Sequence, residues 1–190
     1  MLIVGLDQAP RGIGYAYGEP GSAPVFGWHE CDDYGDNTAR LGKSVREWLV
    51  TFAKSVGAER VYFEQIIVRK HGLHMPTLYK QFAVVAGIET ACEMLGLQDD
   101  CYQLLISDWR KEFYAGARPP KDADSESAVW KDMAVKECAR RNWFTDNHNA
   151  AEACGIWDMG CKITDKAYRL RSRVDKRRQQ SEQDAARRAA

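Results

Sequence analysis

The chain has 190 residues, which suits one domain with a sizeable core, and its 45% hydrophobic content includes no apolar run near the roughly 20 residues of a membrane span. Its six cysteines are widely spaced and form no CxxC pair, which argues against a disulfide framework or a zinc ribbon. The net charge of zero, taken alone, argues weakly against nucleic-acid binding.

The N-terminal segment predicts three strands in an antiparallel meander. Residues 2–7 and 12–18 form apolar runs joined by a short turn, and residues 24–31 form a third run. The first run ends in a carboxylate, Asp7.

Helices and strands are predicted to alternate after the meander. From Thr38 to Val56, apolar residues recur on one helical face, with Asp36 or Asn37 as the cap and Gly57 as the stop. A strand over residues 61–64 follows and ends at Glu64. Residues 77–96 predict a second helix, and residues 102–106 predict a fifth strand. The expected inward residues of the second helix are Leu78, Phe82, Val85, Ile88, Cys92 and Leu95. Strands that alternate with helices imply parallel pairing.

The last third of the chain predicts a loop, two helices and a charged tail. Residues 109–124 resemble a loop, and helices are expected at residues 125–141 and 147–162. Residues 166–190 hold nine Lys or Arg against three Asp or Glu, so they carry +6 and residues 1–165 carry −6. We therefore expect a folded domain over residues 1–165 and a basic helix or tail over residues 166–190, where a solvated charged helix end is the simpler alternative.

Two carboxylates, Asp7 and Glu64, close buried strands in the same way. An isolated charge at such a position must be solvated, paired or metal-bound, because its burial costs several kcal/mol. On the last helix, Glu152 lies about 60° from Asn149 and about 40° from His148 around the axis, so the three side chains share a face. Small residues there (Ala150, Ala151, Ala153 and Gly155) would let this helix approach the sheet. Hard oxygen ligands of this kind suit Mg²⁺ or Mn²⁺.

The ordered motifs resemble those of a known family. They are Val4-Gly5-Leu6-Asp7 with Gly12-Ile13-Gly14-Tyr15-Ala16, then Val61-Tyr62-Phe63-Glu64-Gln65, then Asn149-Ala150-Ala151-Glu152-Ala153. From residue 2 to about residue 162 they resemble the RuvC-type Holliday junction resolvases, in the divergent form of phages and some bacteria. The resemblance implies an α/β fold of the ribonuclease H-like class, with a mixed five-stranded sheet flanked by helices.

The resemblance also implies the chemistry. Two divalent ions, Mg²⁺ or Mn²⁺, would be held by Asp7, Glu64, Asn149 and Glu152, and a water molecule would attack the phosphate. Asn149 stands where the family commonly has an acid or His, so His148 or Asp146 is an alternative ligand, and helix capping is an alternative role for Asn149. Lys131 resembles the family lysine that steadies the scissile phosphate, although exposed lysines are also common at helix starts.

The implied activity is that of a crossover junction endodeoxyribonuclease acting in DNA recombination and repair. The partners would be branched DNA and a second copy of the chain, with a dimer interface built around residues 78–95. The N-terminus lacks the basic flank and cleavage site of a signal peptide, so we expect the cytoplasm of a bacterial or phage-infected cell and no membrane association. Candidate DNA contacts are Arg69, Lys70, His71, His74, Arg110, Lys111, Arg118, Lys121 and Lys131. Ile67 stands where many members have an aromatic wedge, and Tyr79 and Phe82 are expected nearer the core than the DNA.

Other interpretations compete with this one. Asp7 could cap a turn, Glu64 could pair with Arg69 or Lys70, and Glu152 could be a surface residue. At the level of function, the alternatives are a nuclease for forks, other branched DNA or RNA-containing substrates, a DNA structure-binding protein that does not cleave, and a sugar-kinase-like or actin-like ATPase. The last needs a duplicated domain and glycine-rich phosphate loops, for which one copy of the fold leaves no room.

Overall fold

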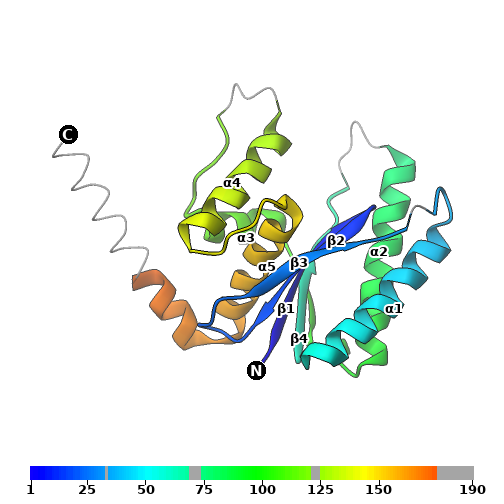
Figure 1. Ribbon diagram of the computed structural model, residues 1–190, viewed down its shortest axis with the longest axis horizontal. Coiled ribbons are helices and arrows are strands. Elements are labelled where there is room, and N and C mark those ends of the chain that lie inside the picture. The colour runs from blue at the N-terminus through cyan, green and yellow to red at the C-terminus, as the bar shows by residue number, and fades with distance from the viewer. Residues whose placement is uncertain (33, 69–73, 121–124, 175–190) are drawn as a thin grey trace.

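The protein is described by a computed structural model over residues 1–32, 34–68, 74–120 and 125–174. One mixed sheet is flanked by helices on both faces (Figure 1). Its elements, besides a 3-10 turn at Gln98–Asp100, are β1 (Ile3–Ala9), β2 (Gly12–Gly18), β3 (Val25–Glu30), α1 (Thr38–Val56), β4 (Arg60–Glu64), α2 (Met75–Met94), β5 (Cys101–Leu104), α3 (Ile106–Phe113), α4 (Glu126–Arg140) and α5 (His148–Thr164).

The strand order is β3-β2-β1-β4-β5. β2 pairs antiparallel with β1 and β3, and β4 pairs parallel with β1 and β5. The predicted meander and parallel pair are therefore confirmed, and with them the ribonuclease H-like fold class. The Asn37 side chain accepts from the amide of Arg40 to begin α1, and Gly57 ends it in the left-handed region at φ 73°.

Two sequence predictions about α3 and β5 were wrong. β5 ends at Leu104 instead of Ile106, and Ile106 begins a helix that runs into the segment expected to be a loop. The helix was missed because it spans eight residues and buries only Trp109 and Phe113, a pattern too short to show a period.

The prediction that Phe82 points inward was also wrong. Phe82 is 46% exposed, and Tyr79 is 56% exposed. The core face of α2 is instead formed by Leu78, Val84, Val85, Ile88, Ala91 and Cys92. Both faces of α2 are apolar, so spacing alone did not distinguish them.

The sheet separates two cores. Leu6 and Phe63 pack with α1 and α2 on one face. Ile3 and Tyr62 pack with α3, α4 and α5 on the other. Because side chains alternate along a strand, Asp7 and Glu64 turn toward the α5 face.

Helix α5 lies directly on the sheet because β1 and β2 carry glycines beneath it. A Cβ on Gly5 would lie 2.7 Å from the Trp157 Cα and 2.8 Å from the Ala153 carbonyl oxygen. A Cβ on Gly14 would collide with the backbone of Asn149. The predicted close approach of α5 to the sheet therefore depends on strand glycines as well as on the small residues of α5. Gly155 is an exception among those small residues, because it faces the Trp109 ring of α3 and not the sheet.

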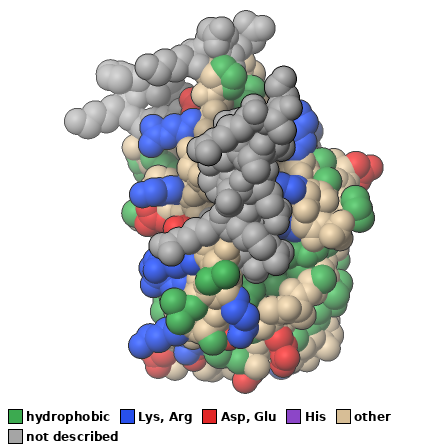
Figure 2. Space-filling model, turned by 90° about the vertical axis from the view of Figure 1, so that its left-hand side faces the viewer, with side chains coloured by type: hydrophobic (Ala, Val, Ile, Leu, Met, Phe, Trp, Pro, Cys, Tyr) green, Lys and Arg blue, Asp and Glu red, His purple; other side chains and the backbone are tan. Residues whose placement is uncertain are grey.

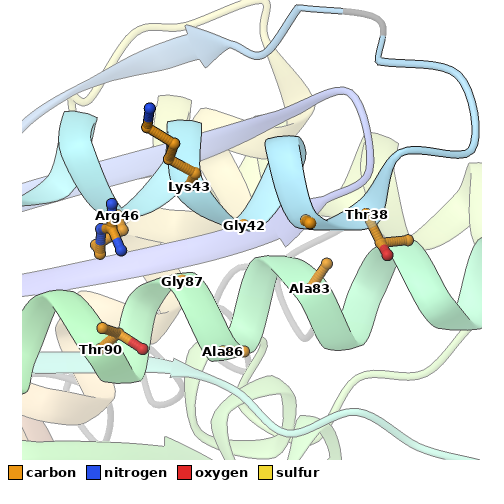
Figure 3. A pocket seen from close by; sticks show the side chains of 9 residues that line it. Thr38, Gly42, Lys43, Arg46, Ala83, Ala86, Gly87 and Thr90 are labelled. Carbon is orange, nitrogen blue, oxygen red and sulfur yellow. The ribbon is translucent and has the colours of Figure 1, made fainter.

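Helices α1 and α2 cross closely on the other face, where Gly42 and Gly87 meet (Figure 3). A Cβ on Gly87 would lie 2.6 Å from the Gly42 carbonyl oxygen. A shallow pocket of about 360 Å³ lies over this crossing, with Thr38, Lys43, Arg46 and Thr90 around it (Figure 3).

Beyond α5, residues 166–174 continue as a helix. Tyr168 donates to the Asp158 carboxylate at 2.7 Å, and Lys162 pairs with the same carboxylate at 2.6 Å, so Asp158 anchors this helix. Figure 2 shows the side of the molecule on which this helix lies in Figure 1, and Lys and Arg side chains are distributed over much of its described surface. Within the described part of the chain, no helix is both long and apolar enough to cross a membrane.

Candidate active site

Three acidic side chains meet where β1 and β4 end. Leu6 pairs with Phe63 in the parallel ladder, so Asp7 and Glu64 follow on neighbouring strands. Asp7 also pairs with Gly14 of β2, and Gly14 contacts the α5 backbone at Asn149. The first turns of α5 therefore lie over Asp7.

The pKa of Asp7 is affected by the two neighbouring glutamates. Burial raises it well above its usual value, and the charges of Glu152 and Glu64 raise it further, whereas Arg110 and Lys131 lower it. Burial also raises the pKa of Glu64 to about 7, against the lowering effects of Trp109 and Arg110. The site thus concentrates negative charge that its two cations offset only in part.

Glu152 is held by an arginine. Its side chain is buried, with the residue 6% exposed, and it accepts from Arg110 Nη2 at 2.9 Å. The guanidinium lies over the rings of Trp109, 5.3 Å from the centroid, and Trp130, at 4.8 Å. Its Nε is buried without a hydrogen-bond partner in the described chain. The surface role considered for Glu152 is therefore wrong.

Two contacts that fix Glu64 had no counterpart in the sequence predictions. The indole nitrogen of Trp109, a fully buried residue, donates to Glu64 Oε2 at 3.0 Å. The Gln8 side chain accepts from the Glu64 amide at 3.1 Å and donates to the Glu64 carbonyl oxygen. Gln8 thereby extends the β1–β4 ladder by one side-chain pair. The position of Trp109 four residues before Phe113 was the one available signal, since that spacing is helical.

The start of α5 carries the remaining candidates. Asn147 is the cap, accepting from the amides of Asn149 and Ala150 at 3.0 Å each, so capping is not the role of Asn149. His148 is half-buried, and burial and the charge of Lys131 lower its pKa while Glu152 raises it. Lys131, His148 and Asn149 line one cavity. Asp146 lies before the helix and is exposed.

The donors suit a hard divalent cation in kind, since they are carboxylate and amide oxygens. Within the described residues, however, no three His, Cys, Asp or Glu side chains are grouped closely enough to hold an ion. The contacts supply the reason: Glu152 is turned onto Arg110 and Glu64 onto Trp109. One oxygen of each glutamate, Oε1 of Glu152 and Oε2 of Glu64, is thus already engaged within the protein.

Comparison with known proteins agrees with the observed topology. A structure of Thermus thermophilus RuvC in complex with a Holliday junction substrate matches with a TM-score of 0.61 at 12% identity, over 83% of this chain and 90% of that one. A second Thermus thermophilus RuvC structure matches with a TM-score of 0.56 at 14% identity, over 83% and 91% of the two chains. This chain has a RuvC-like, ribonuclease H-like fold.

More distant comparisons add little to the RuvC-like fold. The yeast mitochondrial Holliday junction resolvase Ydc2 matches over 88% of this chain and 85% of that one, at 10% identity and a TM-score of 0.42. No protein-family model and no curated protein sequence matches the chain.

The candidate DNA contacts lie at varied positions on the RuvC-like fold. His74, Lys111 and Arg118 are exposed, Lys131 is half-buried at the site, and Arg110 is engaged with Glu152. Arg69, Lys70, His71 and Lys121 lie outside the described residues, and so does any pairing of Glu64 with Arg69 or Lys70.

We expect Glu64 to destabilise the metal-free protein as the pH rises. Its folded pKa of about 7 exceeds the ordinary 4.5, so between these values the unfolded state has lost a proton that the folded state retains. The free energy of unfolding should fall across this window, by roughly 1–3 kcal/mol in all, and no further above it. Urea unfolding of wild type and Glu64→Gln in EDTA from pH 4.5 to 8 would measure this, because the variant's advantage should grow with pH. A difference that is independent of pH would contradict the prediction.

Proposed function

We propose that this protein is a divalent-metal-dependent endonuclease that resolves four-way DNA junctions by paired phosphodiester hydrolysis. The observation that carries the proposal is the convergence of Asp7, Glu64 and Glu152 at one end of the sheet, where the charges of the two glutamates help to raise the pKa of Asp7. The RuvC structure that shares this fold was solved with a Holliday junction substrate, which supports branched DNA as the substrate class.

Each residue of the site has a proposed role. Asp7, Glu64 and Glu152 would hold two Mg²⁺ or Mn²⁺ ions together with Asn149, or with His148 or Asp146 in its place. Such ions, when bound, activate a water molecule and stabilise the leaving oxygen. Trp109 and Gln8 keep the Glu64 carboxylate and backbone in position.

The cations of the site have separate roles in this proposal. The charge of Lys131 lowers the pKa of Asp7, so Lys131 lies near the carboxylates. In this proposal it contacts the scissile phosphate. In the free protein Arg110 neutralises Glu152. In the DNA complex its guanidinium would instead bind a phosphate oxygen. Lys111, Arg118 and His74, with Arg69, Lys70 and Lys121, are proposed to contact the DNA backbone, which would make affinity depend on salt. The helical residues 166–174 present Lys166, Arg169, Arg171 and Arg173 to solvent and are proposed to extend this basic surface.

Paired cleavage needs two active sites, and α2 offers a surface for a homodimer. Met75, Tyr79, Phe82 and Ala86 follow one another at helical spacing and are all exposed. A large apolar stripe on a globular protein is typical of an interaction site. A two-fold symmetric contact would pair the stripe with its copy.

Phe82→Glu should therefore convert a dimer into a monomer. The new carboxylate would lie at the centre of the stripe and face its copy across the two-fold axis, so we expect association to weaken at least about tenfold. Sedimentation velocity over a range of concentrations would measure this. Phe144→Glu is the matched control, because Phe144 is 73% exposed and lies outside α2. If Phe82→Glu sediments like the wild-type dimer, α2 is not the interface.

A substrate panel tests the proposed activity. Labelled four-way junction, replication fork, flap, linear duplex and RNA:DNA hybrid would be incubated with Mg²⁺ or Mn²⁺. We expect symmetric cuts in the junction that leave 5′-phosphate and 3′-hydroxyl ends, which a ligase can seal. Preferential cutting of the fork, flap or hybrid would support the alternative nuclease and reject junction resolution.

A DNA structure-binding protein that does not cleave is the second candidate. The lack of a ready three-residue metal group among the described residues favours it, and so does neutral Asn149 in place of an acid. Tight junction binding without turnover in either metal would establish this second function.

A further inference from the structure

A cavity of about 1170 Å³ opens beside the candidate active site. Lys131, His148 and Asn149 form its wall on the active-site side. The rest of its lining comes from the β1–β2 turn, the end of β3 with the segment after it, and the first turns of α1 and α2. The cavity therefore shares Lys131, His148 and Asn149 with the candidate site, whereas Asp7, Glu64 and Glu152 are not among its lining residues.

Two aromatic residues, Trp28 and Tyr34, line the cavity. Trp28 is half-buried, and its indole packs against β2 at Gly12, where an added Cβ would collide with the ring atoms Cζ2 and Cε2. Tyr34 donates to Asp32 at 3.0 Å, which fixes its ring beside the cavity. The neighbouring His29 points to the opposite side of the strand, where it stacks on Trp48 at 4.4 Å. Trp28 is therefore held in place while it faces the cavity.

The same cavity is lined by cations and by acceptors. Lys80 and Arg11 border it together with Lys131, and none of the three has an ion pair with another described residue. Glu30 and Asp32 supply carboxylate oxygens. Aromatic faces bind bases, ammonium and guanidinium groups bind phosphates, and carboxylates accept from base amino groups. This combination is the chemistry that recognises a nucleotide.

We propose that this cavity binds one unstacked nucleotide of the branched DNA, next to the phosphate that is cut, with its base against Trp28 and Tyr34. The inference rests on the proposed function and deepens it. A base leaves its stack at least cost where pairing is already interrupted, as at a branch point. The cavity would then contribute to the preference for branched over linear DNA.

The test is a double-mutant cycle on junction affinity, in which one amino-acid substitution is combined with the removal of one DNA base. Binding to a four-way junction would be measured in EDTA, so that the strand stays intact, with wild type and Trp28→Ala. The same measurements would use junctions that lack the base at either nucleotide flanking the cleavage site. We expect Trp28→Ala to weaken binding to the intact junction roughly tenfold, in line with the loss of one base–aromatic stack. On one of the abasic junctions the variant should cause no further loss.

The controls separate the possible failures. Trp28→Phe should retain most of the affinity, because it keeps an aromatic face, and Tyr34→Ala should show the same coupling if Trp28→Ala does not fold. Equal losses on intact and abasic junctions, or no loss at all, would overturn the cavity proposal while wild-type cleavage of junctions leaves the proposed function standing. A wild-type protein that neither binds nor cuts any DNA of the panel would overturn both.

Discussion

Asp7→Asn should abolish cleavage and leave junction binding intact. The change removes one negative charge at the centre of the site and almost no volume, so the fold and the surrounding cations remain. We expect the cleavage rate to fall by at least about a thousandfold, equivalent to roughly 4 kcal/mol of lost transition-state stabilisation. The dissociation constant for the junction should stay within about threefold, since phosphate contacts dominate affinity. Cleavage assays with Mg²⁺ and binding assays in EDTA would measure the two effects separately.

Thermal unfolding gives this variant a second readout. The charges of Glu152 and Glu64 act on Asp7, so Asp7→Asn should raise the melting temperature of the metal-free protein. Mg²⁺ should stabilise wild type and should stabilise the variant less. Asp108→Asn is the matched control, because it removes an exposed carboxylate of α3 and should change neither rate nor metal response. Mg²⁺-dependent cutting that persists in a clean Asp7→Asn preparation would reject the site assignment.

Gly5→Ala should be the most damaging single substitution in the sheet. The added Cβ would lie 2.7 Å from the Trp157 Cα and 2.8 Å from the Ala153 oxygen, and helix backbone cannot move aside as a side chain can. Helix α5 would have to lift from β1, and we expect a loss of roughly 3 kcal/mol or more in the free energy of unfolding. At this chain length that corresponds to a fall in melting temperature of about 6–12 °C.

The same substitution should also impair function, because α5 carries Glu152. A displaced helix would hold Glu152 farther from Asp7, so cleavage should be weakened even at temperatures where the variant is folded. Gly57→Ala is the control: it has no neighbour within 4 Å and only the strain of its φ of 73°, so it should cost about 1 kcal/mol and leave cleavage unchanged. A Gly5→Ala protein as stable as Gly57→Ala would show that α5 does not rest on β1 in the way described.

Local patterns predicted most of the elements. The apolar face of α1, its Asn37 cap and the Gly57 stop can be read from the sequence of that segment alone. The strands that carry Asp7 and Glu64 were also predicted, although β1 continues past Asp7 to Ala9. Alternation of strand and helix then implied parallel pairing. The predictions failed where the signal was short or ambiguous, as for α3 with two buried residues and for α2 with apolar residues on both faces.

The candidate site was likewise predictable only in part. Asp7, Glu64 and Glu152 were identified because each stands out against an apolar or small-residue background. The Trp109–Glu64 and Arg110–Glu152 contacts join residues that are 45 and 42 positions apart. Separations of that size leave no periodic trace in one sequence.

The sequence by itself therefore determined the order of the five strands and of every helix except α3, and the acidic residues near the strand ends, since periodicity and burial act over short stretches of chain. Only the tertiary structure decided which partners those acids have. The position of α5 on Gly5 and Gly14, the arginine between two tryptophans and the cavity beside them all depend on close packing of distant segments. Close packing is a property of the folded shape, and no local pattern encodes it.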